Sequence, residues 1–245
     1  MPAYNAQTHI AEAINSVIAQ TLGTWELLVQ DDDSGDRTAE IVKAFQKKDA
    51  RIIYEKNARN VGVCSTRNRA LERARGRYVA FLDADDVWTP EKLRIQVRFM
   101  DETDAEISYA AYYRIDGQGQ VMGLVEVPEE LGYKDMLRSN FIGNLTGIFR
   151  RASLSDARFE PVRHEDYLFW LRAIKRAGRA RAASPCVPLA YYRVSTDSLS
   201  GNKIRSALWQ WNIYRNVLHL SWPRSSFYFL SYAWIAICKR LSDKI

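Results

Sequence analysis

The stretch Tyr78-Val79-Ala80-Phe81-Leu82-Asp83-Ala84-Asp85-Asp86-Val87-Trp88 decides the fold. Its first half alternates aromatic and aliphatic residues and predicts a buried strand. Its second half is crowded with carboxylates, which repel one another unless a positive charge lies among them. Mg²⁺ and Mn²⁺ prefer carboxylate oxygen and often share it with substrate phosphates. Because ligands of open α/β sheets bind beyond the carboxyl ends of strands, the stretch predicts a metal-bridged, phosphate-bearing ligand there. Taken alone, the loop could equally be a solvated acidic turn that caps the next helix.

The sequence around this stretch alternates predicted strands and helices. The first half predicts a helix at 8–20, a strand at 25–30, a helix through Ile41, Val42 and Phe45, a strand at 51–55, a helix at 65–75 and a helix from Thr89 onward. This βαβαβα order is typical of a doubly wound α/β sheet. The second half predicts a hairpin of strands 107–113 and 121–125, a helix at 133–138, a strand at 145–150, a helix at 165–177 and a strand at 187–192.

Composition limits the class of protein. A chain of 245 residues with 47% hydrophobic residues can bury a core, and its three separated cysteines predict neither a disulfide framework nor a zinc site. The seven Lys and Arg residues after residue 202, against one Asp, account for the whole net charge of +6. Residues 1–202 are therefore neutral overall, so we expect no nucleic-acid partner.

Several further motifs occur in a fixed order along residues 1–200. They are Pro2-Ala3-Tyr4-Asn5, Gln20-Thr21, Asp31-Asp32-x-Ser34-x-Asp36-x-Thr38, Asn60-x-Gly62, Arg67-Asn68, Gly76-x-Tyr78 with the acidic loop, Glu165-Asp166 and Tyr192-Arg193. Together these motifs resemble those of the family-2 glycosyltransferases, which are inverting enzymes with the GT-A fold. A narrower likeness, to bacterial teichuronic-acid, capsule and O-antigen enzymes, is carried by 133–137, 140–146 and 211–215.

The resemblance implies a role for each matching residue. For the donor, Pro2, Ala3 and Tyr4 would line the nucleotide base, and Asp32 would accept a hydrogen bond from uracil. Arg67 would approach the diphosphate, Asp83 would bond the ribose hydroxyls, and Ala84 is also expected among the donor-binding residues. Asp85 would hold Mn²⁺ or Mg²⁺ at the phosphates. Asp166 would be the general base for the acceptor hydroxyl, with Glu165 beside it. Single displacement by that hydroxyl would invert the anomeric carbon.

Plainer interpretations exist for most of these residues. Tyr4 could be a core residue, Asp32 a helix cap, and Arg67 the partner of a loop acid. Trp88 and Trp170 are expected in the core or a pocket wall. A non-catalytic module that binds nucleotide sugars is the alternative function. GDP-, dTDP- and CDP-sugars stay open as donors, although Asp32 favours UDP.

The sequence departs from the resembled pattern in two places. Many relatives have a histidine shortly after the Tyr-Arg pair, where this chain has Ser195, so a third protein ligand of the metal is not expected. Relatives also have a β-branched strand before Pro-x-Tyr-Asn, and its absence would leave neighbouring backbone groups unpaired. Met1 is therefore expected to be an internal methionine, and the alternative is a poorly folded, inactive variant.

We predict a catalytic domain at 1–202, divided into a nucleotide-binding half at 1–105 and an acceptor half at 106–202. A helical tail would follow at 203–245. In the tail, helices at 203–220 and 224–241 are expected to break at Trp222-Pro223. The apolar run 227–238 is too short to span a bilayer, but its aromatic residues and basic ends suit an anionic membrane surface. The alternative is a hairpin packed on the domain or on a second subunit. We thus expect a cytoplasmic protein, peripheral on the inner face of the membrane, with a polysaccharide or lipid-linked oligosaccharide acceptor.

Overall fold

A computed structural model of the chain describes residues 1–194 and 203–242. The first half contains β1 (Pro2–Ala3), α1 (Ile10–Ile18), β2 (Leu27–Asp31), α2 (Thr38–Gln46), β3 (Ile52–Lys56), α3 (Val63–Arg73), β4 (Tyr78–Ala80), β5 (Val87–Trp88) and α4 (Lys92–Thr103). The second half contains β6 (Ile107–Ala110), β7 (Tyr112–Ile115), β8 (Val121–Val125), β9 (Glu130–Gly132), α5 (Tyr133–Arg138), the 3₁₀ turn η1 (Asn144–Thr146), β10 (Ile148–Arg150), α6 (Glu165–Ala177), β11 (Arg179–Ser184) and β12 (Ala190–Arg193). The tail contains α7 (Lys203–Asn212), the π-helical η3 (Ile213–Val217) and α8 (Trp222–Ser242).

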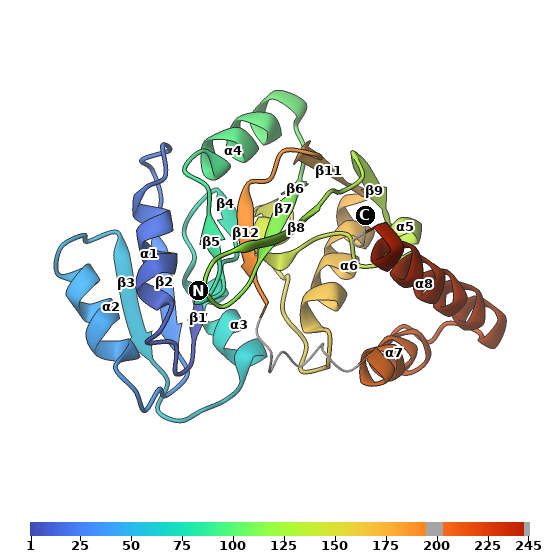
Figure 1. The fold of residues 1–245 in the computed structure, drawn as a ribbon, viewed down its shortest axis with the longest axis horizontal. Coiled ribbons are helices and arrows are strands. Elements are labelled where there is room, and N and C mark those ends of the chain that lie inside the picture. The colour runs from blue at the N-terminus through green and yellow to red at the C-terminus, as the bar shows by residue number, and fades with distance from the viewer. Residues whose placement is uncertain (195–202, 243–245) are drawn as a thin grey trace.

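The predicted α/β class is confirmed. The N-terminal strands form a parallel sheet in the order β1-β2-β3. The second half forms two mixed sheets, in the orders β4-β10-β6-β11-β9 and β5-β12-β7-β8. Figure 1 shows α1 and α2 beside the N-terminal sheet and α7 and α8 at the opposite end of the molecule.

Periodic apolar residues explain how the helices pack. In α1, Ile10, Ala13, Ile14 and Val17 recur at helical spacing and are buried, so one face of the helix covers the N-terminal sheet. The buried apolar residues form two cores, a first one that contains the apolar face of α1 and a second one around α6. At the front of α6, every residue from Tyr167 to Leu171 is buried in the second core. As expected, Trp88 and Trp170 are core residues.

The predicted strand 107–113 is wrong as a single element. It is broken at Ala111, so that β6 belongs to the five-stranded sheet and β7 to the four-stranded one. The physical reason is the pairing of the Ala111 backbone. Its N–H donates to the Ser184 carbonyl at 2.8 Å, and its carbonyl accepts from the Leu189 N–H at 3.0 Å, so the chain crosses between sheets there.

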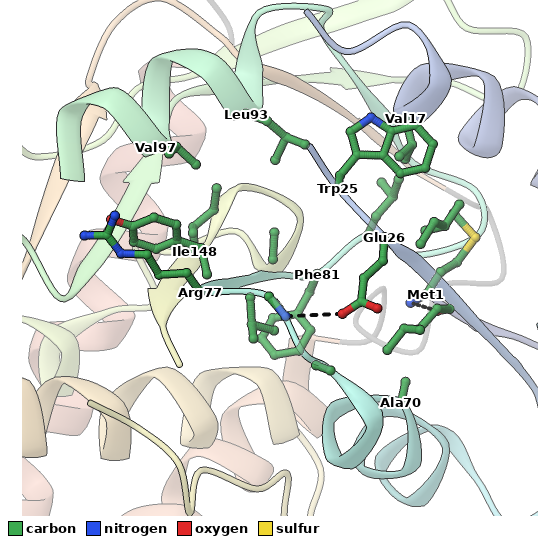
Figure 2. A pocket seen from close by; sticks show the side chains of 18 of the residues that line it. Met1, Val17, Trp25, Glu26, Ala70, Arg77, Phe81, Leu93, Val97 and Ile148 are labelled. Carbon is green, nitrogen blue, oxygen red and sulfur yellow. Dashed lines mark hydrogen bonds between the residues drawn. The ribbon is translucent and has the colours of Figure 1, made fainter. Parts of the chain in front are cut away.

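An apolar cavity separates the N-terminal sheet from the rest. Strand β4 lies at the edge of its sheet and β1 at the edge of the N-terminal sheet, and no described strand pairs with both. A cavity of ≈ 400 Å³ fills the space, and Figure 2 shows Leu93 and Val97 of α4, Trp25 and Met1 around it. The Met1 amine donates to the Leu28 carbonyl at 2.9 Å, and burial lowers the pKa of this amine to about 5. Whether Met1 is internal to a longer chain stays a prediction.

The tail is helical, with a different break from the one predicted. Residues 218–221 separate η3 from α8, which starts at Trp222 rather than at residue 224. Pro223 is tolerated in the first turn of α8 because the N–H that it lacks has no partner within a helix there. Among the described residues, none of the helices has the length and apolarity needed to cross a bilayer.

Candidate active site

The acidic loop follows β4 directly and is held by its own apolar residues. Phe81 and Leu82 are buried in the two cores, and the Asp86 N–H closes a turn on the Asp83 carbonyl at 3.2 Å. Burial, and then the charge of Asp83, raises the pKa of Asp85. Burial, and then the charges of Asp83 and Asp85, raises the pKa of Asp86 well above its usual value. Burial and mutual repulsion therefore disfavour the ionised carboxylates of the loop, and a cation beside them would stabilise that form.

Arg193 at the end of β12 holds this loop in place, although it lies more than 100 residues further along the sequence. Its backbone N–H donates to the Asp86 carboxylate at 2.9 Å, and its Nε donates to the Asp85 carbonyl at 2.9 Å. The same guanidinium pairs with Glu12 of α1 at 2.6 Å. The sequence indicated Arg193 only as part of a motif and gave no sign of this positioning role. Ser195, the other expectation for this region, lies outside the described residues.

The predicted donor residues meet, with one exception, in a cavity of ≈ 370 Å³. It is lined by Pro2, Ala3, Tyr4, Asp32, Asn60, Gly62, Val63, Thr66, Arg67, Asp83 and Asp85. The Tyr4 side chain is 55% exposed, so it is not a core residue and its ring is free to stack on a ligand. Ala84 is the exception, because it packs into the core and does not line this cavity.

Asp32 is tied to the loop that precedes α3. Its Oδ1 accepts from Asn57 Nδ2 at 2.7 Å and from the Val61 N–H at 2.8 Å, while Oδ2 accepts from the Gly62 N–H at 2.8 Å. Burial opposes the charge of Asp32, but these hydrogen bonds outweigh burial and lower the pKa. The carboxylate stays at the wall of the donor cavity while these contacts hold it in place.

Glu165 and Asp166 form the first turn of α6. His164 precedes them in the left-handed region, at φ 60° and ψ 44°. Two carboxylates in a first turn are favoured there by the helix dipole.

Arg67 of α3 joins the two acidic groups. Its Nη2 donates to both oxygens of Asp83, at 2.8 and 2.9 Å, and its Nη1 donates to Glu165 at 2.8 Å. The Arg67 side chain is only 7% exposed. The structure therefore shows the plainer interpretation, in which Arg67 pairs with a loop acid, and its approach to a diphosphate stays a prediction.

A second cavity, of ≈ 910 Å³, lies on the Asp166 side of Arg67. Val63, Arg67 and Asp83 line both this cavity and the donor cavity. Asp85 and Asp166 therefore open into adjoining spaces, with Arg67 at the boundary. The outer wall comes from the tail and includes Trp209, Phe229, Tyr232, Ala233 and Ala236.

The donor set for a metal is small. Among the residues that the structure describes, no three His, Cys, Asp or Glu side chains are grouped to hold a metal ion. Mg²⁺ and Mn²⁺ do not require such a cage, because they are often held by one or two carboxylates together with substrate phosphates. Asp85, a carboxylate at the wall of the donor cavity, fits that mode of binding.

The family model described as "Glycosyl transferase family 2" matches residues 1–159. The chain belongs to this family. Family membership makes the chain a glycosyltransferase, which sets aside the non-catalytic module. Residues 1–159 include the donor cavity and the acidic loop, while Glu165 and Asp166 lie just beyond the matched part.

Two curated relatives within the family resemble almost the whole chain. The chain is 36% identical to the putative teichuronic acid biosynthesis glycosyltransferase TuaG of Bacillus subtilis, over 98% of this chain and 95% of the relative. It is 35% identical to WfgD of Escherichia coli, over 99% of this chain and 94% of the relative. The latter is named a UDP-Glc:alpha-D-GlcNAc-diphosphoundecaprenol beta-1,3-glucosyltransferase.

Solved structures confirm the GT-A fold. TarS 1–349 from S. aureus, solved with UDP-GlcNAc, superposes with a TM-score of 0.74 at 24% identity, covering 95% of this chain and 70% of TarS. The mannosyltransferase PcManGT from Pyrobaculum calidifontis, solved with GDP-Man and Mn²⁺, gives a TM-score of 0.68 at 17% identity, covering 95% of this chain and 67% of that one.

Proposed function

We propose that this glycosyltransferase moves a sugar from a nucleoside diphosphate sugar, with UDP favoured, to a hydroxyl of a growing, lipid-linked surface polysaccharide. Transfer inverts the anomeric carbon and depends on Mg²⁺ or Mn²⁺. The observation that carries the proposal is the contact of two cavities at Arg67, one containing Asp85 and the other Asp166. A single displacement needs a leaving-group site and a base on opposite sides of one sugar.

The donor cavity has features that suit a uridine diphosphate. Tyr4 presents an exposed ring for the base, and the Asp32 carboxylate, which lines the same cavity, suits the imide N–H of uracil. Two relatives support this choice by their names, since WfgD is named for UDP-Glc and TarS was solved with UDP-GlcNAc. PcManGT, solved with GDP-Man, keeps guanine as the second candidate base.

Asp85 would hold the metal, and Asp83 would bond the ribose after exchanging its contact with Arg67. The metal, when bound, neutralises charge that develops on the departing diphosphate. Asp166 would take the proton of the attacking hydroxyl, a role worth about 10²–10⁴-fold in rate for a positioned base. Glu165, held by Arg67, would fix the first turn of α6 and with it the position of Asp166.

The acceptor side has an apolar wall that suits a lipid carrier. Phe229 and Tyr232 of α8 and Trp209 of α7 line the same cavity as Asp166. An acceptor with sugar at one end and hydrocarbon at the other would match this mixture of carboxylates and aromatic rings. WfgD supports the choice, because its name gives an acceptor linked to diphosphoundecaprenol.

The outward face of α8 supports a peripheral position on the inner face of the membrane. Phe227, Leu230 and Trp234 are exposed on it, and Arg224 precedes them. Aromatic residues with basic neighbours favour the interface of an anionic bilayer.

We expect Leu230→Ser and Trp234→Ser each to weaken binding to vesicles with anionic lipid about tenfold or more, because burying one large apolar side chain contributes about 1.5–3 kcal/mol. Flotation with vesicles of defined charge measures the effect. Met122→Ser is the matched control, since Met122 is equally exposed but lies on β8. If both α8 variants bind vesicles normally and instead change the sedimentation coefficient, the face contacts a second copy of the chain.

The direct test of the proposed function is turnover of nucleotide sugars by the purified chain. We expect Mn²⁺- or Mg²⁺-dependent release of UDP from one or more UDP-sugars, abolished by EDTA and restored by the metal. A chain that turns over none of the UDP-, GDP-, dTDP- and CDP-sugars with either metal would contradict the proposal.

A further inference from the structure

The short turn η1 is pressed between two aromatic rings. A Cβ on Gly147 would overlap the ring of Trp170, and a Cβ on Gly143 would lie 2.8 Å from the ring of Tyr112. Only glycine permits such close approach of backbone to rings. The Thr146 carbonyl is also fixed, because Gln96 Nε2 donates to it at 2.8 Å. The position of the first residue of η1, Asn144, is therefore rigidly defined.

Trp170 also determines how the Asn144 amide is oriented. The indole Nε1 of Trp170 donates to Asn144 Oδ1 at 3.2 Å. An indole N–H can only donate, so the amide must present its oxygen there and its Nδ2 must face elsewhere. Asn144 is 8% exposed, and within the described part of the chain its Nδ2 has no hydrogen-bond partner.

A buried amide donor without a partner is costly and calls for an explanation. Asn144 lines the same ≈ 910 Å³ cavity as Asp166 and Tyr112. The residue that carries the unpaired donor thus lines the space in which the acceptor would be activated. A ligand with a hydrogen-bonding oxygen would satisfy it.

We propose that Asn144 selects the acceptor by donating from Nδ2 to a neutral oxygen, a hydroxyl or an amide carbonyl, on the sugar that is glycosylated. The assignment rests on the proposed function, because it takes Asp166 as the base. A neutral oxygen fits better than an anionic one, since the carboxylates of Asp83, Asp86 and Asp166 share the cavity. A site with a buried donor rejects ligands that lack the matching oxygen, because the donor is then left unpaired.

The test compares Asn144→Ala with the wild-type chain on octyl glycosides of hexoses and N-acetylhexosamines and on their monodeoxy and deacetylated analogues. We expect kcat/KM for the accepted glycoside to fall about 10–100-fold in the variant, as for loss of one buried hydrogen bond. Hydrolysis of the donor by water and KM for the donor should stay within about twofold. One analogue should lack the oxygen that Asn144 contacts. With the wild-type chain, kcat/KM for this analogue should be about 10–100-fold below that for the accepted glycoside, and Asn144→Ala should lower it no further.

Two other variants separate selection from folding. Gln20→Ala removes a buried amide that bonds Thr89 and Leu93, away from η1 and from both cavities, so it should lower Tm and leave the ratio of transfer to hydrolysis unchanged. Asn144→Asp keeps an oxygen facing Trp170 and loses the donor, so it replaces Asn144→Ala if that variant does not fold.

Equal losses of hydrolysis and transfer in the Asn144 variants would overturn the proposal, as would undiminished discrimination among the analogues. Failure of the proposed function has a different signature, because the wild-type chain itself would then turn over no nucleotide sugar, and both proposals would be overturned together.

Discussion

Replacing Asp166 with Asn should lower the rate of glycosyl transfer about 10³-fold, in the middle of the range for removal of a positioned general base. An amide cannot take the proton of the acceptor hydroxyl, yet it fills the same volume at the start of α6. Donor binding should persist, because Asp166 does not line the donor cavity. The measurements are kcat for transfer and the affinity for UDP by calorimetry.

Asp156→Asn is the matched control for this variant. Asp156 pairs with Arg176 of α6, the helix that contains Asp166, but Asp156 is exposed and lies outside both cavities. Loss of an exposed ion pair changes stability by about 0–1 kcal/mol, so transfer should be unaffected. If Asp166→Asn transfers sugar at a rate near that of the wild-type chain, another group must be the base.

Replacing Asp85 with Ala should lower transfer by a similar factor, about 10³, for a different reason. The diphosphate would depart without the charge neutralisation of a bound metal, which contributes several kcal/mol. Donor binding should also change, unlike in the Asp166 variant, because the metal would join the phosphates to the loop. Titration of Mn²⁺ by electron paramagnetic resonance, with and without UDP, reports binding independently of activity.

Asp104→Asn serves as the control for a lost carboxylate. Asp104 ends α4 in the left-handed conformation, which Asn also tolerates, and it lies outside both cavities. We expect its Mn²⁺ titration to match that of the wild-type chain. Unchanged, UDP-dependent Mn²⁺ binding in the Asp85→Ala variant would remove Asp85 from the metal site.

Local sequence pattern predicted the N-terminal half of the fold well and the second half less well. Strands such as β2 have apolar runs, and α1 has a clear periodic face, so each is recognisable from its own residues. Strand β11 (Arg179–Ser184) was missed because it alternates arginine and alanine. Its inward residues, Ala180 and Ala182, are small beneath α6, and alanine has low strand propensity. The break at Ala111 depends on partners more than 70 residues away, which no local pattern encodes.

The site divides in the same way. Asp83, Asp85, Glu165 and Asp166 were predicted as site residues from their motifs, and the structure places them around two adjoining cavities. The loop-fixing role of Arg193 was not found, because its contacts with Asp85 and Asp86 span more than 100 residues. The Asn144 donor was not found either, because only the tertiary contact with Trp170 determines which end of the amide lacks a partner.

The shared guanidinium of Arg67 has a thermodynamic consequence. It is bonded at once to Asp83 on one side and to Glu165 on the other, so a molecule that engages either carboxylate alters the energy of the other contact. Such linkage is reciprocal. If one substrate changes the affinity for the other by some factor, the other substrate changes the affinity for the first by the same factor. The affinity for each substrate should consequently depend on whether the other is bound.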